Sequence, residues 1–301
     1  MSKASDKPNV DRSAGLWPNG LRIGFHLSIA AGPKVLFERY SIRNCRALQI
    51  FVASPRVWAM KPWTDELIEK FSQERALAEN PPLIVHTRYL ANLASANPDV
   101  RRKAVEIIRF EYLAAARCNA DLVVVHMGSS PARDEGFRFM KENLEEALRG
   151  VAQKKPLLLL ENTAGERNDL GADLKEIALV REAVSFPTGV CFDTCHGFQA
   201  GYDLRTNEAR MSLETQMKSL FGNDGVRLIH LNDSMSPFAE HHDRHEDVGL
   251  GNIGAEALAA FLLMPLFQGL PVIMETPQAG NEDPTADLAN VERLRKAFSV
   301  F

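Results

Sequence analysis

The most constraining feature of this sequence is a pattern that occurs six times, in which a short apolar run ends in a histidine or a carboxylate. The residues that end these runs are His86, His126, Glu161, Asp193, His230 and Glu275. The runs are apolar throughout, which is typical of parallel strands buried on both faces. Six such strands with metal-binding residue types at their C-terminal ends predict a barrel that gathers ligands at one mouth.

Two further apolar runs, residues 21–25 and 47–52, bring the predicted strands to eight, and helical patterns lie between them. One helix begins at Asn97 and Pro98, which suit its cap and first position, and another is expected near 285–299. Strand–helix units repeated eight times close into a (β/α)8 TIM barrel, an α/β fold with the metal site at the C-terminal ends of the strands. An open doubly wound sheet is the alternative, although ligands at nearly every strand end favour a ring.

Length and composition fit one such barrel. The chain has 301 residues, of which 45% are hydrophobic and 25% charged, as in soluble globular proteins. Residues 1–20 are polar, so we expect an N-terminal tail followed by one catalytic domain over 21–301, with no signal peptide or membrane span. The four cysteines form no CxxC pair and are typical of reduced thiols in a cytoplasmic protein.

The net charge at first argues against a nucleic-acid partner. The formal charge is −4 and the pI about 6.1, whereas nucleic-acid-binding domains usually carry a basic surface. Bound metal ions weaken this objection, because three divalent ions would add six positive charges and bring the total to +2. Those charges would lie where a substrate phosphate must approach.

Three more candidate ligands follow the strands. His196 comes three residues after Asp193, and Asp243 and His245 lie two apart in a polar loop over 232–254, where alternate side chains of an extended segment share a face. One zinc takes about four ligands, so nine fit three ions that share a bridging carboxylate. Imidazole and carboxylate without thiolate suit Zn²⁺, with Mn²⁺ or Fe²⁺ as other occupants. A lone histidine after a strand is more often structural, but nine such groups in one cavity would be costly without cations.

Short motifs in a fixed order carry a family resemblance. They are ENTAG at 161–165, DTCH at 193–196 with GYD at 201–203, HLNDS at 230–234, DRH at 243–245 with GLGNIG at 249–254, and ETP at 275–277. In this order they resemble endonuclease IV, the zinc-dependent AP endonuclease family of base excision repair. The resemblance runs from about Gly24 to the end of the chain, and each of the nine ligand positions is filled.

The resemblance implies a division of the ligands among three zinc ions. His86, His126 and Glu161 would hold the first, Glu161 would bridge to a second held also by Asp193, His230 and Glu275, and His196, Asp243 and His245 would hold the third. Glu161 and Glu275 are the implied catalytic residues. The implied reaction is hydrolysis of double-stranded DNA 5′ to an abasic site, leaving a 3′-hydroxyl and a 5′-deoxyribose phosphate, together with trimming of blocked 3′ ends.

The resemblance also implies that two loops select damaged DNA. Arg56 and Trp58 resemble one segment that the family inserts into bent DNA beside the extruded nucleotide, and Tyr89 and Leu90 resemble the second. Packing of Trp58 against a neighbouring loop and solvation of Arg56 are the alternatives. Arg88 departs from the small or acidic residues common in the family, so it is expected to contact phosphate or to alter substrate preference.

Other departures and alternatives remain open. Met127 replaces a proline of many members before the turn at Gly128, and His26 is expected to support the ligands rather than join them. A metal-dependent sugar isomerase or epimerase on a related barrel is the rival enzyme, but it would leave the Asp243–His245 segment without a use. A non-catalytic metal-dependent DNA-binding protein is the other alternative, and the fold alone does not decide. A monomer acting on one duplex, without a membrane, is expected.

Overall fold

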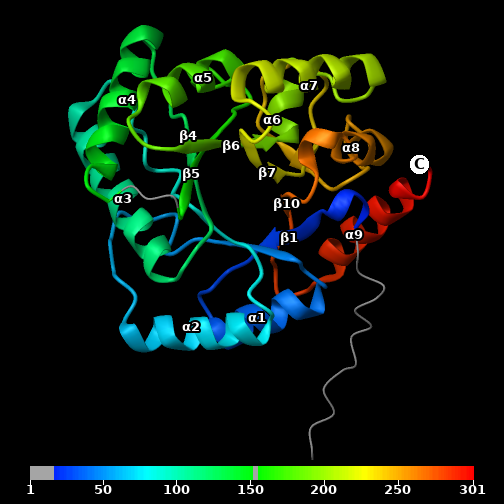
Figure 1. Cartoon of the computed structure of the whole chain (residues 1–301), viewed down its shortest axis with the longest axis horizontal. Coiled ribbons are helices and arrows are strands. Elements are labelled where there is room, and N and C mark those ends of the chain that lie inside the picture. Colours follow the sequence, from blue (N-terminus) through cyan, green and yellow to red (C-terminus); the bar gives the residue numbers. More distant parts are fainter. Residues whose placement is uncertain (1–16, 152–154) are drawn as a thin grey trace, which may run out of the picture.

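Eight parallel strands close into a barrel in the computed structural model, which describes residues 17–151 and 155–301 (Figure 1). Around the ring, β1 is followed by β10, β7, β6, β5, β4, β3 and β2. This confirms the predicted TIM barrel and excludes the open sheet. The strands are β1 Arg22–His26, β2 Ala47–Ile50, β3 Leu83–His86, β4 Leu122–His126, β5 Leu157–Glu161, β6 Thr188–Asp193, β7 Val226–His230 and β10 Pro271–Met274.

Helices surround the strands, with α1 and α2 together on one side of the barrel and α8 packed against α9 beside β1 (Figure 1). The Asn97 side chain accepts a hydrogen bond from Asp99 N at the start of α3, so the predicted cap is confirmed. The helices are α1 Pro33–Ile42, α2 Asp65–Leu77, α3 Pro98–Arg117, α4 Arg133–Leu148, α5 Leu174–Ala183, α6 Thr194–Gln199, α7 Asn207–Phe221, α8 Ala255–Leu262 and α9 Thr285–Phe298, with short 3₁₀ turns η2 at Pro18–Gly20 and η3 at Pro265–Phe267.

The barrel interior explains why the strand ends converge. Side chains alternate between the two faces of a strand, so a residue two positions before a ligand points to the same side as that ligand. These preceding residues belong to one buried apolar cluster inside the barrel, made of Ala47, Ile84, Leu122, Val124, Leu159, Cys191, Leu228 and Ile273. The ligands therefore form the next inward-facing layer above this cluster.

Strand register brings particular ligands side by side. His126 of β4 is the register partner of Glu161 of β5, and Asp193 of β6 is the partner of His230 of β7. The outward-facing alternate residues, such as Val123 and Val125, join the larger core beneath the helices. The same alternation thus buries the outer face against helices and aims the ligands inward.

Residues 1–16 of the expected N-terminal tail lie outside the described residues. Trp17 is buried, with its ring 5.9 Å from that of Phe298, and Pro18–Gly20 form a short 3₁₀ turn. The last four residues of the expected tail therefore pack on the barrel. Within the part of the chain that the structure describes, no helix has the length and apolar character needed to cross a membrane.

Candidate metal centre

All nine predicted ligands converge at the C-terminal end of the barrel. Five of them are the last residues of their strands, and Glu275 follows the end of β10 by one residue. Asp193 also caps α6, because its Oδ1 accepts a hydrogen bond from His196 N at 2.8 Å, and this local turn places His196 beside it. The loop over 232–254 supplies Asp243 and His245, the latter in a two-stranded hairpin of β8 Asp233–Ser234 and β9 His245–Glu246.

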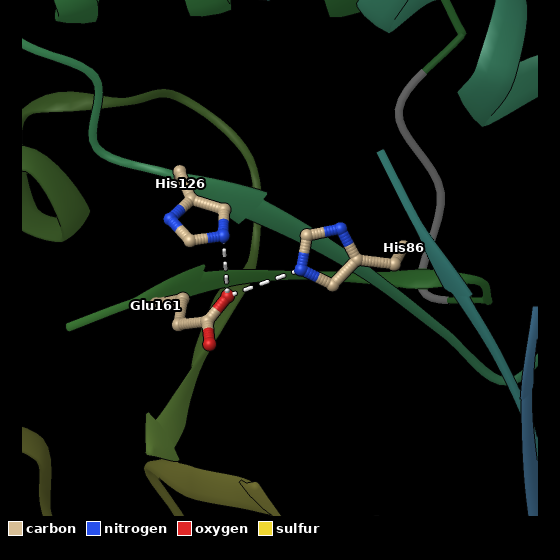
Figure 2. Close-up of side chains that lie close together, drawn as sticks. All are labelled: His86, His126 and Glu161. Carbon is tan, nitrogen blue, oxygen red and sulfur yellow. Dashed lines mark hydrogen bonds and ion pairs between the residues drawn. The ribbon is translucent and has the colours of Figure 1, made fainter. Parts of the chain in front are cut away.

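A first group joins His86, His126 and Glu161 (Figure 2). Glu161 Oε2 lies 3.3 Å from His86 Nε2 and 3.2 Å from His126 Nε2. His126 Nε2 is buried and has no hydrogen-bond partner among the described residues. An imidazole nitrogen in this position is available to a metal ion.

A second group shares Glu161 through its other oxygen. His230 Nδ1 lies 2.7 Å from Glu161 Oε1 and 3.2 Å from Glu275 Oε2. Asp193, assigned to this group by the resemblance, is fully buried, and its Oδ2 accepts a hydrogen bond from Asn232 Nδ2 at 2.6 Å and lies 3.7 Å from His245 Nε2 of the third group. Glu161 thus has one oxygen toward each of the first two groups.

The chemistry of the third group fits a bound cation when its imidazoles are neutral. His196 Nδ1 lies 2.9 Å from Asn162 O and His245 Nδ1 lies 3.0 Å from Glu275 O. A carbonyl oxygen only accepts, so each Nδ1 carries the proton and each Nε2 presents a lone pair. These two Nε2 atoms lie 3.4 Å apart, and Asp243 Oδ1 lies 3.2 and 3.4 Å from them. Three converging acceptors without a donor fit a divalent metal ion.

The same reasoning applies to the other two groups. Thr87 O lies 2.6 Å from His86 Nδ1, so the lone pair of His86 Nε2 faces Glu161. Gln49 Oε1 lies 2.9 Å from His230 Nε2, so the lone pair of His230 Nδ1 faces Glu161 as well. Carbonyl partners that fix the ring tautomer in this way are typical of histidine ligands. The donor set therefore fits bound metal ions throughout.

Protons and metal ions compete for these nitrogens. Burial lowers the pKa of His196, but Asp193, Asp243 and Glu161 outweigh it and raise that pKa well above its ordinary value. Burial raises the pKa of the Glu161 carboxyl, but His230 and other imidazoles outweigh it and hold that pKa well below its usual range. In the metal-free protein, protons would therefore occupy the place that metal ions take.

We expect metal-free protein to lose stability as the pH rises from about 7 to about 9. The pKa is raised in His86, His196 and His230, so their contribution is complete below the ordinary value of 6.5 and is lost as the pH passes through the raised value. His26 and His126, whose pKa is lowered, add nothing further above 6.5. Thermal unfolding with and without a chelator tests this, and a midpoint of the chelated protein that stays level or rises would contradict it.

Several side chains that sequence reasoning missed hold the ligands in place. Gln49 Nε2 donates to Glu275 Oε1 at 2.6 Å, and His26 Nδ1, as expected of a supporting residue, lies 3.1 Å from the same oxygen. Gln49 follows Ala47 by two positions, so it occupies the ligand layer of its strand. Asp233 is buried and accepts backbone N–H groups from the far end of its loop, at Gly249, Ile253 and Gly254. It thereby folds the loop that carries Asp243 and His245.

His241, His242 and the four cysteines are not among the nine predicted ligands. His241 Nδ1 lies 3.0 Å from Ala164 O, and His242 is exposed. All four cysteines are buried and free. The Cys191 thiol lies within 4.8 Å of ligand atoms of Glu161 and His230, but burial raises the pKa of that thiol to about 12, which disfavours the thiolate that a metal needs.

The residues predicted to contact DNA lie on two neighbouring loops. Arg56 is exposed, Trp58 is 40% exposed, and Lys103 Nζ lies 5.4 Å from the Trp58 ring centroid. Tyr89 is 60% exposed, and its ring centroid lies 5.3 Å from that of His86 and 5.5 Å from that of His126. Leu90 beside it is partly buried.

Two departures from the family pattern have a structural outcome. The Arg88 side chain is fully buried and pairs with Glu111, so the expectation that it contacts phosphate is wrong. Met127 is buried, and Gly128 has a φ of 74°, so the tight turn after β4 is kept without proline.

Comparisons with known proteins agree with this geometry. Residues 41–297 match the family described as xylose isomerase-like TIM barrel. A relative named Probable endonuclease 4, from Halothermothrix orenii, is 36% identical over 278 residues, which cover 91% of this chain and 99% of the relative. The crystal structure of endonuclease IV from Thermus thermophilus is 31% identical, with a TM-score of 0.83 over 93% of this chain and 100% of that one.

The barrel alone is shared more widely. A D-tagatose 3-epimerase-like protein is 21% identical, with a TM-score of 0.68 over 93% of this chain and 97% of that one, and this likeness shows the fold alone. The endonuclease relatives are closer in sequence and match along nearly their whole length. The chain therefore belongs to the endonuclease IV family of AP endonucleases, the metal-dependent hydrolases of DNA repair.

Proposed function

We propose that this protein cleaves double-stranded DNA 5′ to abasic sites with three divalent metal ions, leaving a 3′-hydroxyl and a 5′-deoxyribose phosphate, and that it also trims blocked 3′ ends. The observation that carries this is the sharing of Glu161 between two ligand groups, with a third group beside them. Clustered divalent ions are the typical catalysts of phosphodiester displacement. Zn²⁺ suits the donor set best, and Mn²⁺ or Fe²⁺ are alternatives.

Each group has a defined set of ligands. His86, His126 and Glu161 would hold one ion, and His196, Asp243 and His245 another, since the ligand atoms within each of these two sets lie close together. Glu161, His230 and Glu275 would hold the remaining ion together with Asp193, which the family resemblance assigns to it. When bound, the ions supply activation of water and neutralisation of charge on the phosphate oxygens.

Side chains beside the ligands position Glu275, the carboxylate that would orient a water. Gln49 and His26 both contact Glu275 Oε1, and Glu275 Oε2 points toward His230. Since neighbouring imidazoles hold the pKa of Glu275 below its usual range, this carboxylate stays charged and would orient a water by accepting its hydrogen bond. The exposed Tyr89 ring lies beside His86, so Tyr89 stands at the edge of the ligand layer.

DNA selection would rest on the two loops at the barrel mouth. Arg56 and Trp58 from one loop and Tyr89 and Leu90 from the other would enter the gap beside an extruded abasic nucleotide. A damaged, unpaired site costs least to extrude, so insertion favours it over intact duplex. We propose that the protein works in the cytoplasm as a monomer.

A duplex with one tetrahydrofuran abasic analogue tests this function. The purified protein, loaded with Zn²⁺, should nick the strand on the 5′ side of the analogue, and a chelator should abolish nicking. The product ends identify the cleaved bond. Failure of the metal-loaded protein to nick, together with turnover of a ketose sugar, would replace the proposal with the isomerase alternative.

A further inference from the structure

Arg88 is a buried arginine that joins two loops at the barrel mouth. It lies in the loop after β3, and its side chain is fully buried. Its Nε donates to Glu111 Oε1 at 2.5 Å. Its Nη1 donates to Val57 O at 2.6 Å and to Ala59 O at 2.9 Å, both in the loop after β2. One guanidinium therefore bonds to a helix and to a second loop.

Glu111 fixes the backbone of Arg88 as well as its side chain. This glutamate is fully buried on α3, and its Oε2 accepts a hydrogen bond from Arg88 N at 3.0 Å. Tyr89 is the next residue, and its exposed ring lies over His86. Glu111 thus fixes the backbone of Arg88, the residue directly before the exposed Tyr89.

The 56–62 segment of the loop after β2 has no buried side chain to hold it. Every residue from 56 to 62 is exposed. The two carbonyls that Arg88 binds belong to Val57 and Ala59, which stand on either side of Trp58. Exposed segments without a buried apolar side chain are commonly mobile, so a buried polar anchor matters more here than in a packed loop.

We propose that Arg88 is a positioning residue that fixes the Arg56–Trp58 segment relative to Tyr89 and so preorganises both segments for damaged DNA. This inference rests on the proposed function of those segments. A buried ion pair contributes little net stability but can specify one geometry. A loop ordered before binding avoids an entropic cost when the DNA arrives, so loss of the anchor weakens binding rather than chemistry.

The variant Arg88→Lys tests this role. Lysine keeps a positive charge beside Glu111, but its single ammonium lacks the planar fork that reaches the carboxylate and both carbonyls together. We expect KM for the tetrahydrofuran duplex to rise about tenfold while kcat changes by less than about threefold. The double variant Arg88→Met with Glu111→Met removes both buried charges while keeping apolar volume, and should show the same split.

Arg75→Lys is the matched control. Arg75 is also buried, and it donates to Asp121 Oδ2 at 2.8 Å and to the carbonyls of Pro81 and Asn119. These partners precede β3 and β4, so they lie at the opposite end of the barrel from the metal centre. This variant should leave KM, kcat and loop exposure unchanged, even if it lowers the unfolding midpoint.

Limited trypsin digestion gives a readout that does not depend on activity. Cleavage after Arg56 should be about tenfold faster in Arg88→Lys than in the parent, and unchanged in Arg75→Lys. If cleavage and KM in Arg88→Lys match those of the control, Arg88 does not position the loops. If the parent does not nick abasic DNA, the proposed function fails, while the cleavage rate still decides whether Arg88 holds the segment.

Discussion

Glu161→Gln is expected to reduce kcat for abasic-site cleavage by about a thousandfold or more, while binding of the uncleaved duplex changes little. Glu161 has one oxygen toward His86 and His126 and the other toward His230, so it serves two ligand groups together. Glutamine keeps the shape but removes the charge. Since an active-site metal ion is worth several kcal/mol in the transition state, disturbing two of them gives a loss of about this size.

The measurement combines single-turnover cleavage with DNA binding by fluorescence anisotropy. Glu166→Gln is the control, because Glu166 lies in the loop that follows Glu161 and its Oε1 accepts from Asp243 N at 3.1 Å. Its loss should cost less than about tenfold in rate. A Glu161→Gln protein that cleaves like the parent would show that the bridging assignment is wrong.

Arg56→Ala is expected to lower discrimination between abasic and intact duplex about tenfold, with a much smaller effect on the cleavage rate. Arg56 is exposed and lines a cavity of about 610 Å³ together with His26, which contacts Glu275 Oε1. A side chain that fills the gap beside an extruded nucleotide acts only on damaged DNA. Its removal should therefore weaken binding of the abasic duplex selectively.

Lys61→Ala separates this effect from charge alone. Lys61 is an exposed cation of the same loop, and it does not line that cavity. Loss of a simple phosphate contact weakens binding to intact and damaged duplex alike and lowers the salt dependence of both. Should Arg56→Ala keep the same ratio of dissociation constants as the parent, Arg56 would have no insertion role.

The alternation of side chains between the two faces of a strand explains how much of the site could be predicted from the sequence. The apolar runs marked the strands, and the polar residue that ends each run marked the inward layer, because side chains at alternate positions share a face. Gln49 was missed since its strand was predicted to reach residue 52, whereas β2 ends at Ile50. Counting two positions on from the inward-facing Ala47 places Gln49 in the layer of the ligands.

The loops were less predictable, since their contacts join residues far apart in the chain. Asp233 belongs to the HLNDS motif at the start of a polar loop, but nothing in the sequence shows that it is buried and holds the backbone around Gly249 and Ile253. Arg88 looked like a surface cation beside a ligand. In the structure it points inward, to the buried Glu111, which lies 23 residues later on α3, and to the carbonyls of Val57 and Ala59. Sequence spacing carries no signal for such pairs.

Metal titration with simultaneous activity measurement tests the central claim most directly. Chelated protein would receive Zn²⁺ stepwise while bound metal per chain and nicking of the tetrahydrofuran duplex are followed together. The three ligand groups predict about three ions per chain, with nicking reaching its plateau only as the last of them binds. Full nicking at one ion per chain, or three bound ions without nicking, would contradict the account.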